Sequence, residues 1–277
     1  MNRAISVWHG RFGRATIYEM DRPMIMHAHR EGHLIFYVGG APGWLAMPNG
    51  RYPIAPGFAV AVSPWEQHCF IPEDNALRAS VMLILYINQD WFAQMGRGLH
   101  KALYFGRVPI TVTPEIRAAV RHAEGIVLDG PAASSFDATL YHLTDLCFDQ
   151  SWQSIGPVRP RAPGLQHIDF RVRKSLRLLS EQIGGDITLD AVARDAGLSR
   201  PHFYKLFRQQ IGVTPNIYLN TLRMEKAVEL LTGSDRSVTD IGFDLGFSSQ
   251  SVFTRFFMAN VGMAPTDYRR ATKILHG

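Results

Sequence analysis

Cysteine is scarce in this sequence of 277 residues, which contains only Cys69 and Cys147. Two cysteines so far apart cannot form a disulfide framework, and they do not supply the paired thiolates of a cysteine-based zinc site. We expect both to be reduced, partly buried thiols. The fold must therefore be held together by hydrophobic cores, which a hydrophobic content of 46% supports for two domains.

Long hydrophobic runs and recognisable catalytic motifs are also absent. No run approaches the ~20 apolar residues of a membrane-spanning helix, and the N-terminus lacks the charged and then apolar segments of a signal peptide. No nucleophile–base pair or phosphate-binding loop can be recognised. These absences predict a cytoplasmic protein with no membrane partner, and they give little support to an enzyme.

A degenerate repeat is the most informative feature that is present. The segment Thr188–Pro215 returns at Ser237–Pro265, at an offset of 49 residues in its first half. After an insertion of one residue in the second turn, the offset becomes 50. A repeat of this length outranks any local signal. The recurring pairs are Val192/Ile241, Gly197/Gly246, Leu198/Phe247, Phe203/Phe253, Phe207/Phe257, Gly212/Gly262 and Pro215/Pro265.

Each copy has the features of a helix-turn-helix unit. A hydroxyl side chain, Thr188 or Ser237, caps a first helix whose apolar residues recur at helical spacing. Gly197 or Gly246 ends that helix, because glycine adopts a left-handed turn without a Cβ penalty. A second helix follows and buries phenylalanines. A plain helical hairpin is the alternative for one copy, but two copies with the same pattern favour the helix-turn-helix.

Polar side chains on the second helices point away from the phenylalanines. Arg and Lys at such positions can bind guanine, and Gln can bind adenine, in the major groove. Asn216–Thr232, between the copies, lacks Gly and Pro and predicts one helix of about 25 Å, which could hold two recognition helices about 34 Å apart. Arg208 and Arg236 are expected to contact phosphates. The predicted recognition residues are Arg200, Pro201, Tyr204, Lys205, Gln250, Ser251, Thr254 and Arg255.

The charge distribution agrees with a polyanionic partner. From Leu165 onward there are 15 basic and 11 acidic residues, a net charge of +4, whereas the preceding part carries a net charge of only +1. The basic excess therefore follows the repeat, as binding to double-stranded DNA requires.

The segment Leu189–Arg269 resembles the DNA-binding domain of AraC-type transcription regulators. The resemblance rests on Arg223 and Ala227 in the connecting helix, on Gly246-Phe247, and on the closing motif Gly262-x-x-Pro265-x-x-Tyr268-Arg269. It implies two helix-turn-helix subdomains that enter successive major-groove segments on one face of bent DNA. One residue departs from the family pattern. Gly242 replaces the usual Ala, which weakens that helix by about 1 kcal/mol.

The first 110 residues are typical of an all-β unit. Short apolar runs alternate with Gly, Pro and Asn turns, a spacing that predicts a β-barrel or sandwich. The predicted strands are Ala15–Met20, His33–Val38, Gly43–Met47, Gly57–Val62 and Leu77–Ile87.

This segment resembles, more weakly, the cupin barrel that AraC-type regulators often carry as an effector domain. Period two along a strand places His27 and His29 on one face. His27, His29, His33 in place of Glu, and Gly40 match the first cupin motif, and Pro56-Gly57 and His68 match the second. In metal-dependent cupins these positions hold the ion.

Two interpretations of the four histidines are open. They can bind zinc, nickel or iron(II), or they can be strand and turn residues, some of which hydrogen-bond an organic effector. We favour the second and assign no cofactor, because many effector cupins hold no metal and the motif's glutamate is missing. Aromatic residues, Phe36 among them, could line an effector pocket or belong to the core. The candidate effector-binding residues are His27, His29, His33, Tyr37, Trp44, Trp65 and His68.

Residues Pro114–Trp152 change to helical spacing and predict two helices separated by Asp129-Gly130-Pro131. In the AraC family such helices commonly provide a dimer contact, and the alternative is that they cap their own barrel. Gly156–Gly164 is a proline-rich linker, and Asp169–Ile183 predicts a further helix. The expected fold is α+β: a barrel over residues 1–113, a helical hairpin over 114–155, the linker 156–164, and an all-α double helix-turn-helix domain over 165–277.

Together these features predict a sequence-specific DNA-binding transcription regulator that responds to a small effector in its barrel. Family resemblance implies an activator, a homodimer and contact with RNA polymerase. The alternative is a metal-dependent cupin enzyme or a metal sensor fused to a DNA-binding domain. Its whole support is the set of four histidines.

Overall fold

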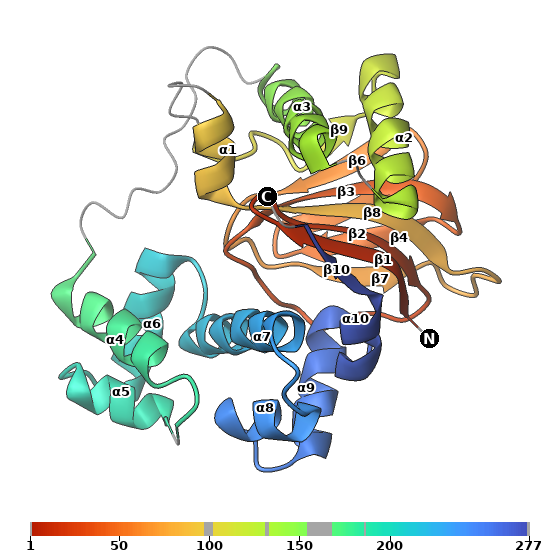
Figure 1. Cartoon of the computed structure of the whole chain (residues 1–277). Helices are drawn as coiled ribbons and strands as arrows, with labels where there is room; N and C mark the ends of the chain where they lie inside the picture. The colour runs from red at the N-terminus through yellow and green to blue at the C-terminus, as the bar shows by residue number, and fades with distance from the viewer. Residues whose placement is uncertain (1, 97–101, 131–132, 154–167, 186, 276–277) are drawn as a thin grey trace.

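The computed structural model describes residues 2–96, 102–130, 133–153, 168–185 and 187–275. Its N-terminal part contains a seven-stranded sheet in the order β10-β1-β2-β8-β3-β6-β9 and a three-stranded sheet in the order β5-β4-β7 (Figure 1). The strands are β1 (Arg3–Gly10), β2 (Gly13–Met20), β3 (Gly32–Gly40), β4 (Gly43–Met47), β5 (Gly50–Ile54), β6 (Phe58–Val62), β7 (Cys69–Pro72), β8 (Ser80–Ile87), β9 (Pro109–Thr111) and β10 (Thr272–Ile274).

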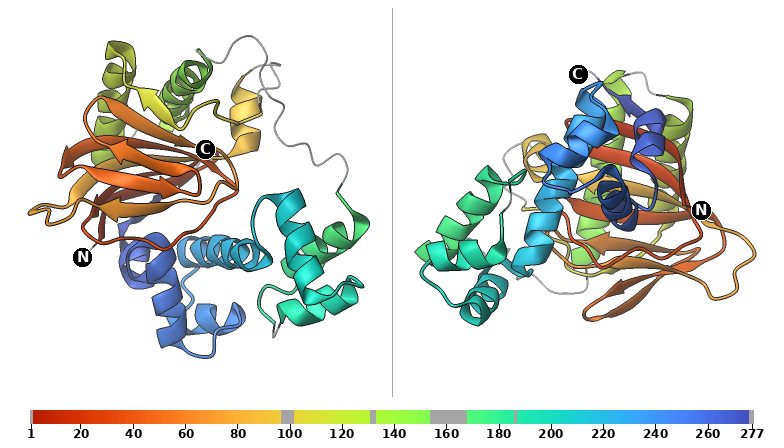
Figure 2. Two further views of the ribbon diagram at one scale, coloured as in Figure 1. Left: turned by 180° about the vertical axis from the view of Figure 1, so that it is seen from behind. Right: turned by 90° about the horizontal axis from the view of Figure 1, so that it is seen from below.

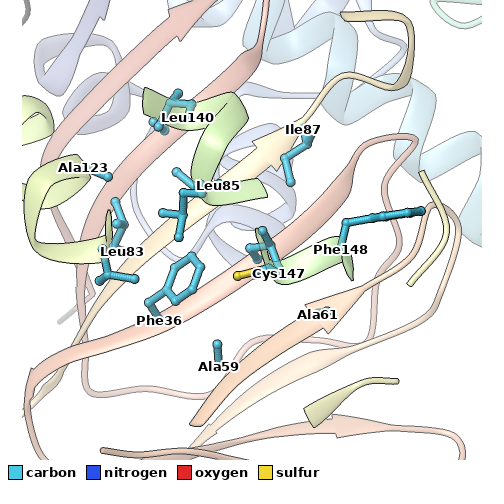
Figure 3. Packing of buried hydrophobic residues seen from close by; sticks show 14 of the residues in the cluster. Phe36, Ala59, Ala61, Leu83, Leu85, Ile87, Ala123, Leu140, Cys147 and Phe148 are labelled. Carbon is cyan, nitrogen blue, oxygen red and sulfur yellow. The ribbon is translucent and has the colours of Figure 1, made fainter. Parts of the chain in front are cut away.

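Strand β8 shows how the barrel is built, because both of its faces are buried. Met82, Ile84 and Tyr86 face a core shared with the three-stranded sheet. Leu83 and Leu85 alternate with them and pack under two long helices on the outer face (Figure 3). A strand buried on both faces is expected to form a nearly continuous apolar run, as this one does.

The two helices on the outer face are α2 (Pro114–Asp129) and α3 (Ala133–Trp152). They are the predicted hairpin, and their apolar stripes, represented by Val127 and Leu143, are fully buried against the barrel sheet (Figures 1 and 3). The structure thus gives these stripes the capping role. A dimer contact would have to use the outward faces of these helices, because the apolar faces are already covered.

The C-terminal part is helical, and its two helix-turn-helix units form where the repeat predicts them. Gly197 and Gly246 adopt the left-handed conformation, with φ of 70° and 79°, directly after the first helix of each unit. No helix in the described ranges is both long and apolar enough to cross a bilayer. The remaining helices are α1 (Gln89–Met95), α4 (Phe170–Glu181), α5 (Leu189–Asp195), α6 (Arg200–Ile211), α7 (Pro215–Gly233), α8 (Val238–Asp244), α9 (Gln250–Val261) and α10 (Pro265–Ala271).

Helix α7 is part of both helix-turn-helix cores. Tyr218 and Leu222 pack in the core of α4–α6, and Ala227 and Leu231 pack in the core of α8–α10, which is continuous with the barrel interior. Figure 2 shows α7 running beside the barrel between the two helical units. The single connecting helix predicted from the sequence therefore also forms part of the contact between barrel and helices.

Gly242 on α8 has a packing reason. A Cβ at this position would lie 3.0 Å from the Cβ of Phe253 and 3.2 Å from its Cγ. The side chain of Phe253, which is fully buried, approaches the α8 backbone closely. The helix propensity lost at Gly242 is therefore the cost of close packing between α8 and α9.

The strand predictions were incomplete. The structure adds β1, β5, β7, β9 and β10, of which β5 and β7 contain a proline and are short. Leu77 was expected in a strand but is fully exposed, and β8 begins only at Ser80. Strand β10 pairs in parallel with β1, so the C-terminal segment returns to the N-terminal sheet, a tertiary contact that local sequence does not encode. The predicted linker Gly156–Gly164 lies outside the described residues.

Both cysteines are free thiols, as expected. Cys69 is half-buried, and Cys147 lies on the buried face of α3, where burial raises the pKa of its thiol well above the usual value.

Phe253→Ala should lower the free energy of unfolding by roughly 3–5 kcal/mol, because a fully buried phenylalanine is replaced by a cavity. Phe243→Ala is the matched control in the same subdomain, since this side chain is 54% exposed and its removal leaves no cavity. Chemical denaturation of the full chain measures both variants. Equal losses in the two variants would contradict this packing.

Candidate DNA-binding surface and histidine cluster

Helix α6 presents a polar face opposite its buried side. Phe203 and Phe207 are fully buried, while Pro201, Lys205 and Arg208 are exposed. Arg200 pairs with Asp190 at 3.1 Å between Nη1 and Oδ2, and its guanidinium lies 5.7 Å from the ring centre of Tyr204, which is half-buried. Four of the five residues predicted on this helix are therefore exposed, and the fifth, Tyr204, is half-buried with its ring against that of Phe203 at 5.9 Å between centroids.

Helix α9 repeats this arrangement. Phe253 and Phe257 are fully buried, and Gln250, Ser251 and Arg255 are exposed. Thr254 is half-buried on the same helix. Gln250 Oε1 accepts a hydrogen bond of 2.9 Å from the hydroxyl of Thr239 on α8. The structure thus aims one recognition helix from each unit outward.

The basic side chains on this surface differ in how firmly the protein holds them. Arg236, which precedes α8, forms an ion pair with Asp244, and its carbonyl accepts a hydrogen bond from Arg269. Lys205, Arg208 and Arg255 have no hydrogen-bond or ion-pair partner within the described part of the chain. These three cations are therefore the best placed to bind an external anion.

The four predicted histidines come together in the barrel. His27, His29, His33 and His68 are each at most 9% exposed, and neighbouring ring centroids lie between 4.6 and 4.8 Å apart. One ring nitrogen from each of His27, His29 and His68 lies within 4.8 Å of the others. The backbones of His27 and His68 form an isolated antiparallel bridge, with N···O distances of 3.0 and 2.9 Å.

Hydrogen bonds fix the orientation of two of these rings. The Nδ1 of His27 lies 2.7 Å from the carbonyl of Ile25, and the Nδ1 of His68 lies 2.8 Å from the carbonyl of Glu66. Because a carbonyl only accepts, Nδ1 must donate, which leaves the Nε2 of each ring with a free lone pair. The Nε2 atoms of His29 and His33 are buried without a hydrogen-bond partner.

Burial keeps these imidazoles neutral. It lowers the pKa of His27 to about 4 and that of His68 to about 3, although the carbonyl partners act in the opposite direction. Burial also lowers the pKa values of His29 and His33 well below the usual value, with a smaller contribution from the other histidines. Neutral imidazoles are the form that binds metal ions.

The cavity beside the cluster is small. About 30 Å³ is open among His27, His33, His68 and the surrounding apolar side chains. This is room for a water molecule or an ion, whereas pockets for organic ligands usually measure about 300–1,000 Å³.

The aromatic residues predicted to line an effector pocket do not meet at this cluster. Tyr37 shares the inward face of β3 with His33, but its hydroxyl donates to the carbonyl of Gly40 at the far end of the strand. Trp44 is half-buried on β4, and Trp65 stacks on Tyr218 of α7 at 5.0 Å between ring centroids. Phe36 belongs to the core under α2 and α3, because alternate residues of a strand face opposite sides of the sheet. A role of these aromatic residues in effector binding therefore stays a prediction.

Tyr86 on β8 was missed by the sequence reasoning, although its ring centroid lies 4.3 Å from that of His33. Tyr86 lies in a strand made almost entirely of apolar residues. The only sequence signal for it is that every second residue of this strand faces the barrel interior. Trp65, a predicted pocket residue, has a φ of 66°, which is unusual for a bulky side chain. Its side chain lies at the contact between the barrel and α7.

Three contacts join the histidine loops to α7. The hydroxyl of Thr221 donates to the carbonyl of Ala28 at 2.9 Å, and Glu225 pairs with Arg30 at 3.0 Å. The third contact is the stacking of Trp65 on Tyr218 of α7, and the backbone N–H of Trp65 in turn donates to the carbonyl of His29 at 2.8 Å. The backbone of the cluster is therefore bonded directly to the helix shared by both helix-turn-helix units.

Comparisons with known proteins agree with both halves of this description. A helix-turn-helix domain family matches residues 192–271. The HTH-type transcriptional activator RhaS of Escherichia coli strain E24377A is 29% identical over 254 residues, covering 87% of this chain and 86% of RhaS. RhaS of Citrobacter koseri is 27% identical over 258 residues, covering 89% and 88%.

Solved structures share the whole fold. A structure of apo ToxT from Vibrio cholerae strain SCE256 has a TM-score of 0.62 and 13% identity, covering 93% of this chain and 96% of its own. A structure of ToxT with a bound unsaturated fatty acid has a TM-score of 0.60 and 13% identity, covering 92% and 94%. At this identity the likeness describes the fold alone.

Lys205→Ala and Arg255→Ala should each weaken binding to the preferred DNA site by about 1–3 kcal/mol and relax its preference at one base pair, if these side chains contact bases. Arg208→Ala should instead weaken all sequences alike, as loss of a phosphate contact does. Mobility shifts on a site selected from random DNA, with base-pair variants of it, measure both effects. Unchanged base preference in both of the first two variants would overturn the recognition face.

Acidification should destabilise the metal-free barrel between pH 6.5 and about pH 4. In this range the unfolded chain binds protons on these histidines and the folded chain does not, so stability falls as pH falls, by up to about 1.4 kcal/mol per pH unit for each histidine. Denaturant unfolding at a series of pH values gives the slope. Replacement of the exposed His122 by Ala is the control and should leave the slope of stability against pH unchanged. A flat profile would show that the cluster is not held neutral.

Proposed function

We propose that this chain is an AraC-type transcription regulator, which binds DNA through α6 and α9 and regulates transcription in response to a ligand held by its N-terminal barrel. The observation that carries this proposal is the pair of outward basic and polar helix faces, one from each unit of the repeat. Because α7 connects the units as one continuous helix, both faces would engage the same stretch of double-stranded DNA.

The remaining partners follow from the same family. RhaS is named as an activator, and an activator acts through RNA polymerase, so we assign both to this chain. We also propose a homodimer, since two copies on adjacent sites gain affinity from linkage. The outer faces of α2 and α3 are the surfaces left for it, with Arg117, Arg121 and Leu128 exposed along α2. Sedimentation of the full chain tests the dimer.

We further propose that the regulatory ligand in the barrel is a divalent transition-metal ion of the zinc, nickel and iron class. Imidazole nitrogen suits all three ions. The observations in its favour are the buried, neutral rings, the two Nε2 lone pairs oriented by Nδ1–carbonyl hydrogen bonds, and the two buried Nε2 atoms without partners. Metal-binding histidines usually have such carbonyl partners. His27, His29 and His68 would hold the ion, with His33 as a fourth ligand.

The size of the cavity favours an ion over an organic effector inside the barrel, and a sensor over an enzyme. A cavity of about 30 Å³ leaves no room for a substrate beside the ion. ToxT, in a related fold, is described with a fatty acid bound, so a second, organic ligand at another place in this fold is compatible with the proposal.

The ion would act through α7. It would tie together the loop of His27 and His29 and the loop of His68, and both loops contact α7 through Ala28–Thr221 and Trp65–Tyr218. If the ion binds one arrangement of these loops more tightly than another, it shifts the equilibrium between the corresponding placements of the recognition helices. The size of the shift is the difference between the two binding free energies.

The full chain, stripped of metal, should bind about one Zn²⁺ per chain and should unfold at a higher temperature with the ion present, because the ion binds only the folded site. His29→Ala and His68→Ala should each lose at least about tenfold in affinity, while His122→Ala, on an exposed helix face, should keep it. Isothermal titration calorimetry reports both stoichiometry and affinity. Full affinity in the two cluster variants would refute the metal site and leave the DNA-binding proposal standing.

A further inference from the structure

A second and larger cavity lies between the barrel and the DNA-binding helices. It has a volume of about 310 Å³, roughly ten times that of the cavity beside the histidines. Its barrel side includes Arg14 on β2 and Tyr86 on β8, and its other side includes Glu225 and Val228 on α7 and Val261 on α9. Figure 1 shows α7 and α10 next to the sheet that contains β1 and β2, with α9 beyond α10. The volume is at the lower end of the range for small-molecule sites.

Arg14 is a buried cation whose direct hydrogen-bond and ring contacts are with neutral groups, while the carboxylate of Glu31 attracts it without forming an ion pair. The residue is 8% exposed, its Nη1 donates to the hydroxyl of Tyr268 at 3.0 Å, and its guanidinium carbon lies 3.5 Å from the ring centre of Tyr86. Its Nε is buried and has no hydrogen-bond partner, and none of the ion pairs between described residues includes it. A buried charge without a counter-ion is costly, and a guanidinium binds a carboxylate well.

The opposite wall carries an acceptor that also lacks a partner. Glu225 uses Oε2 to pair with Arg30, but its Oε1 is buried without a hydrogen-bond partner. Glu31 lines the same cavity, and Glu229 does too, although it pairs with Lys226. The buried oxygen of Glu225 favours a positively charged donor on the ligand, whereas Glu229, whose side chain is 66% exposed, contributes little.

The remaining lining is aliphatic. Met224, Val228 and Val261 supply the apolar part of the lining. A matching ligand therefore combines a carboxylate for Arg14, an ammonium group for Glu225 and an aliphatic side chain.

We propose that this cleft binds a small aliphatic amino acid, whose carboxylate is held by Arg14 and whose ammonium group is held by Glu225. The cleft has both polar walls only when the barrel is docked on α7 and α9. The ligand therefore favours the docked arrangement, and its effect on DNA affinity rests on the function proposed above. The site itself is separate from the ion in the barrel, although His29 contributes to the lining of both.

Calorimetry and thermal unfolding of the full chain test the site directly. The probes are L-valine, L-leucine and L-methionine, together with 4-methylpentanoate and 3-methylbutylamine, which are leucine without its ammonium group and without its carboxylate. We expect at least one of the amino acids to bind at one molecule per chain and to raise the unfolding temperature. If leucine is that ligand, each truncated probe should bind about tenfold more weakly or worse, because one buried charge is left unpaired.

Three variants separate the site from the fold. Glu225→Gln should lose about tenfold in amino-acid affinity, and Val261→Phe, which fills the cleft, should abolish binding. Glu229→Gln is the matched control on α7, because its carboxylate is already paired with Lys226 and should matter little. Arg14→Lys keeps the charge at the buried position and should retain part of the affinity.

The proposal is overturned if none of the three amino acids binds. It is also overturned if 4-methylpentanoate binds as tightly as leucine, or if Glu225→Gln leaves the affinity unchanged. Mobility shifts without added ligand report operator binding separately, so the cleft can fail while the DNA-binding function stands.

Discussion

The packing of α7 against three partners at once is the constraint on which the rest of the structure depends. Its Tyr218 and Leu222 complete the core of one helix-turn-helix unit, and its Ala227 and Leu231 complete that of the other. Its Thr221 is bonded to the backbone between His27 and His29 in the barrel. Because all three contacts are on one continuous helix, neither recognition helix can change its position relative to the barrel without breaking buried contacts.

The two proposed ligands act on the same contact from different sides. An ion among the histidines would order the loops that bear on α7 from within the barrel. An amino acid in the cleft would bridge Arg14 on the barrel to Glu225 on α7. Tyr268 supports this contact, since its buried hydroxyl bonds both His9 and Arg14, and β10 follows directly and pairs with β1. The end of the repeat, at Tyr268, is therefore also part of the junction between barrel and helices.

The sequence predicted the helical half well and the barrel only in outline. The repeat located α5–α9 because glycine turns and phenylalanine stripes are local signals. The four histidines were correctly grouped, but Arg14, Tyr86 and Glu225 were not found, since each is brought into place by pairing between distant segments. The place of Trp65 against α7 could not be predicted either, because its left-handed φ is not indicated by the local sequence.

Reciprocal coupling between the barrel and DNA is the most direct test of this account. Operator affinity would be measured with and without Zn²⁺ on a DNA site selected from a random pool, and Zn²⁺ affinity would be measured with and without that DNA. If α7 transmits the state of the histidine cluster, both affinities must change by the same factor. The account would be contradicted if Zn²⁺ binds tightly but its affinity is the same with and without DNA, and if operator affinity is the same with and without Zn²⁺.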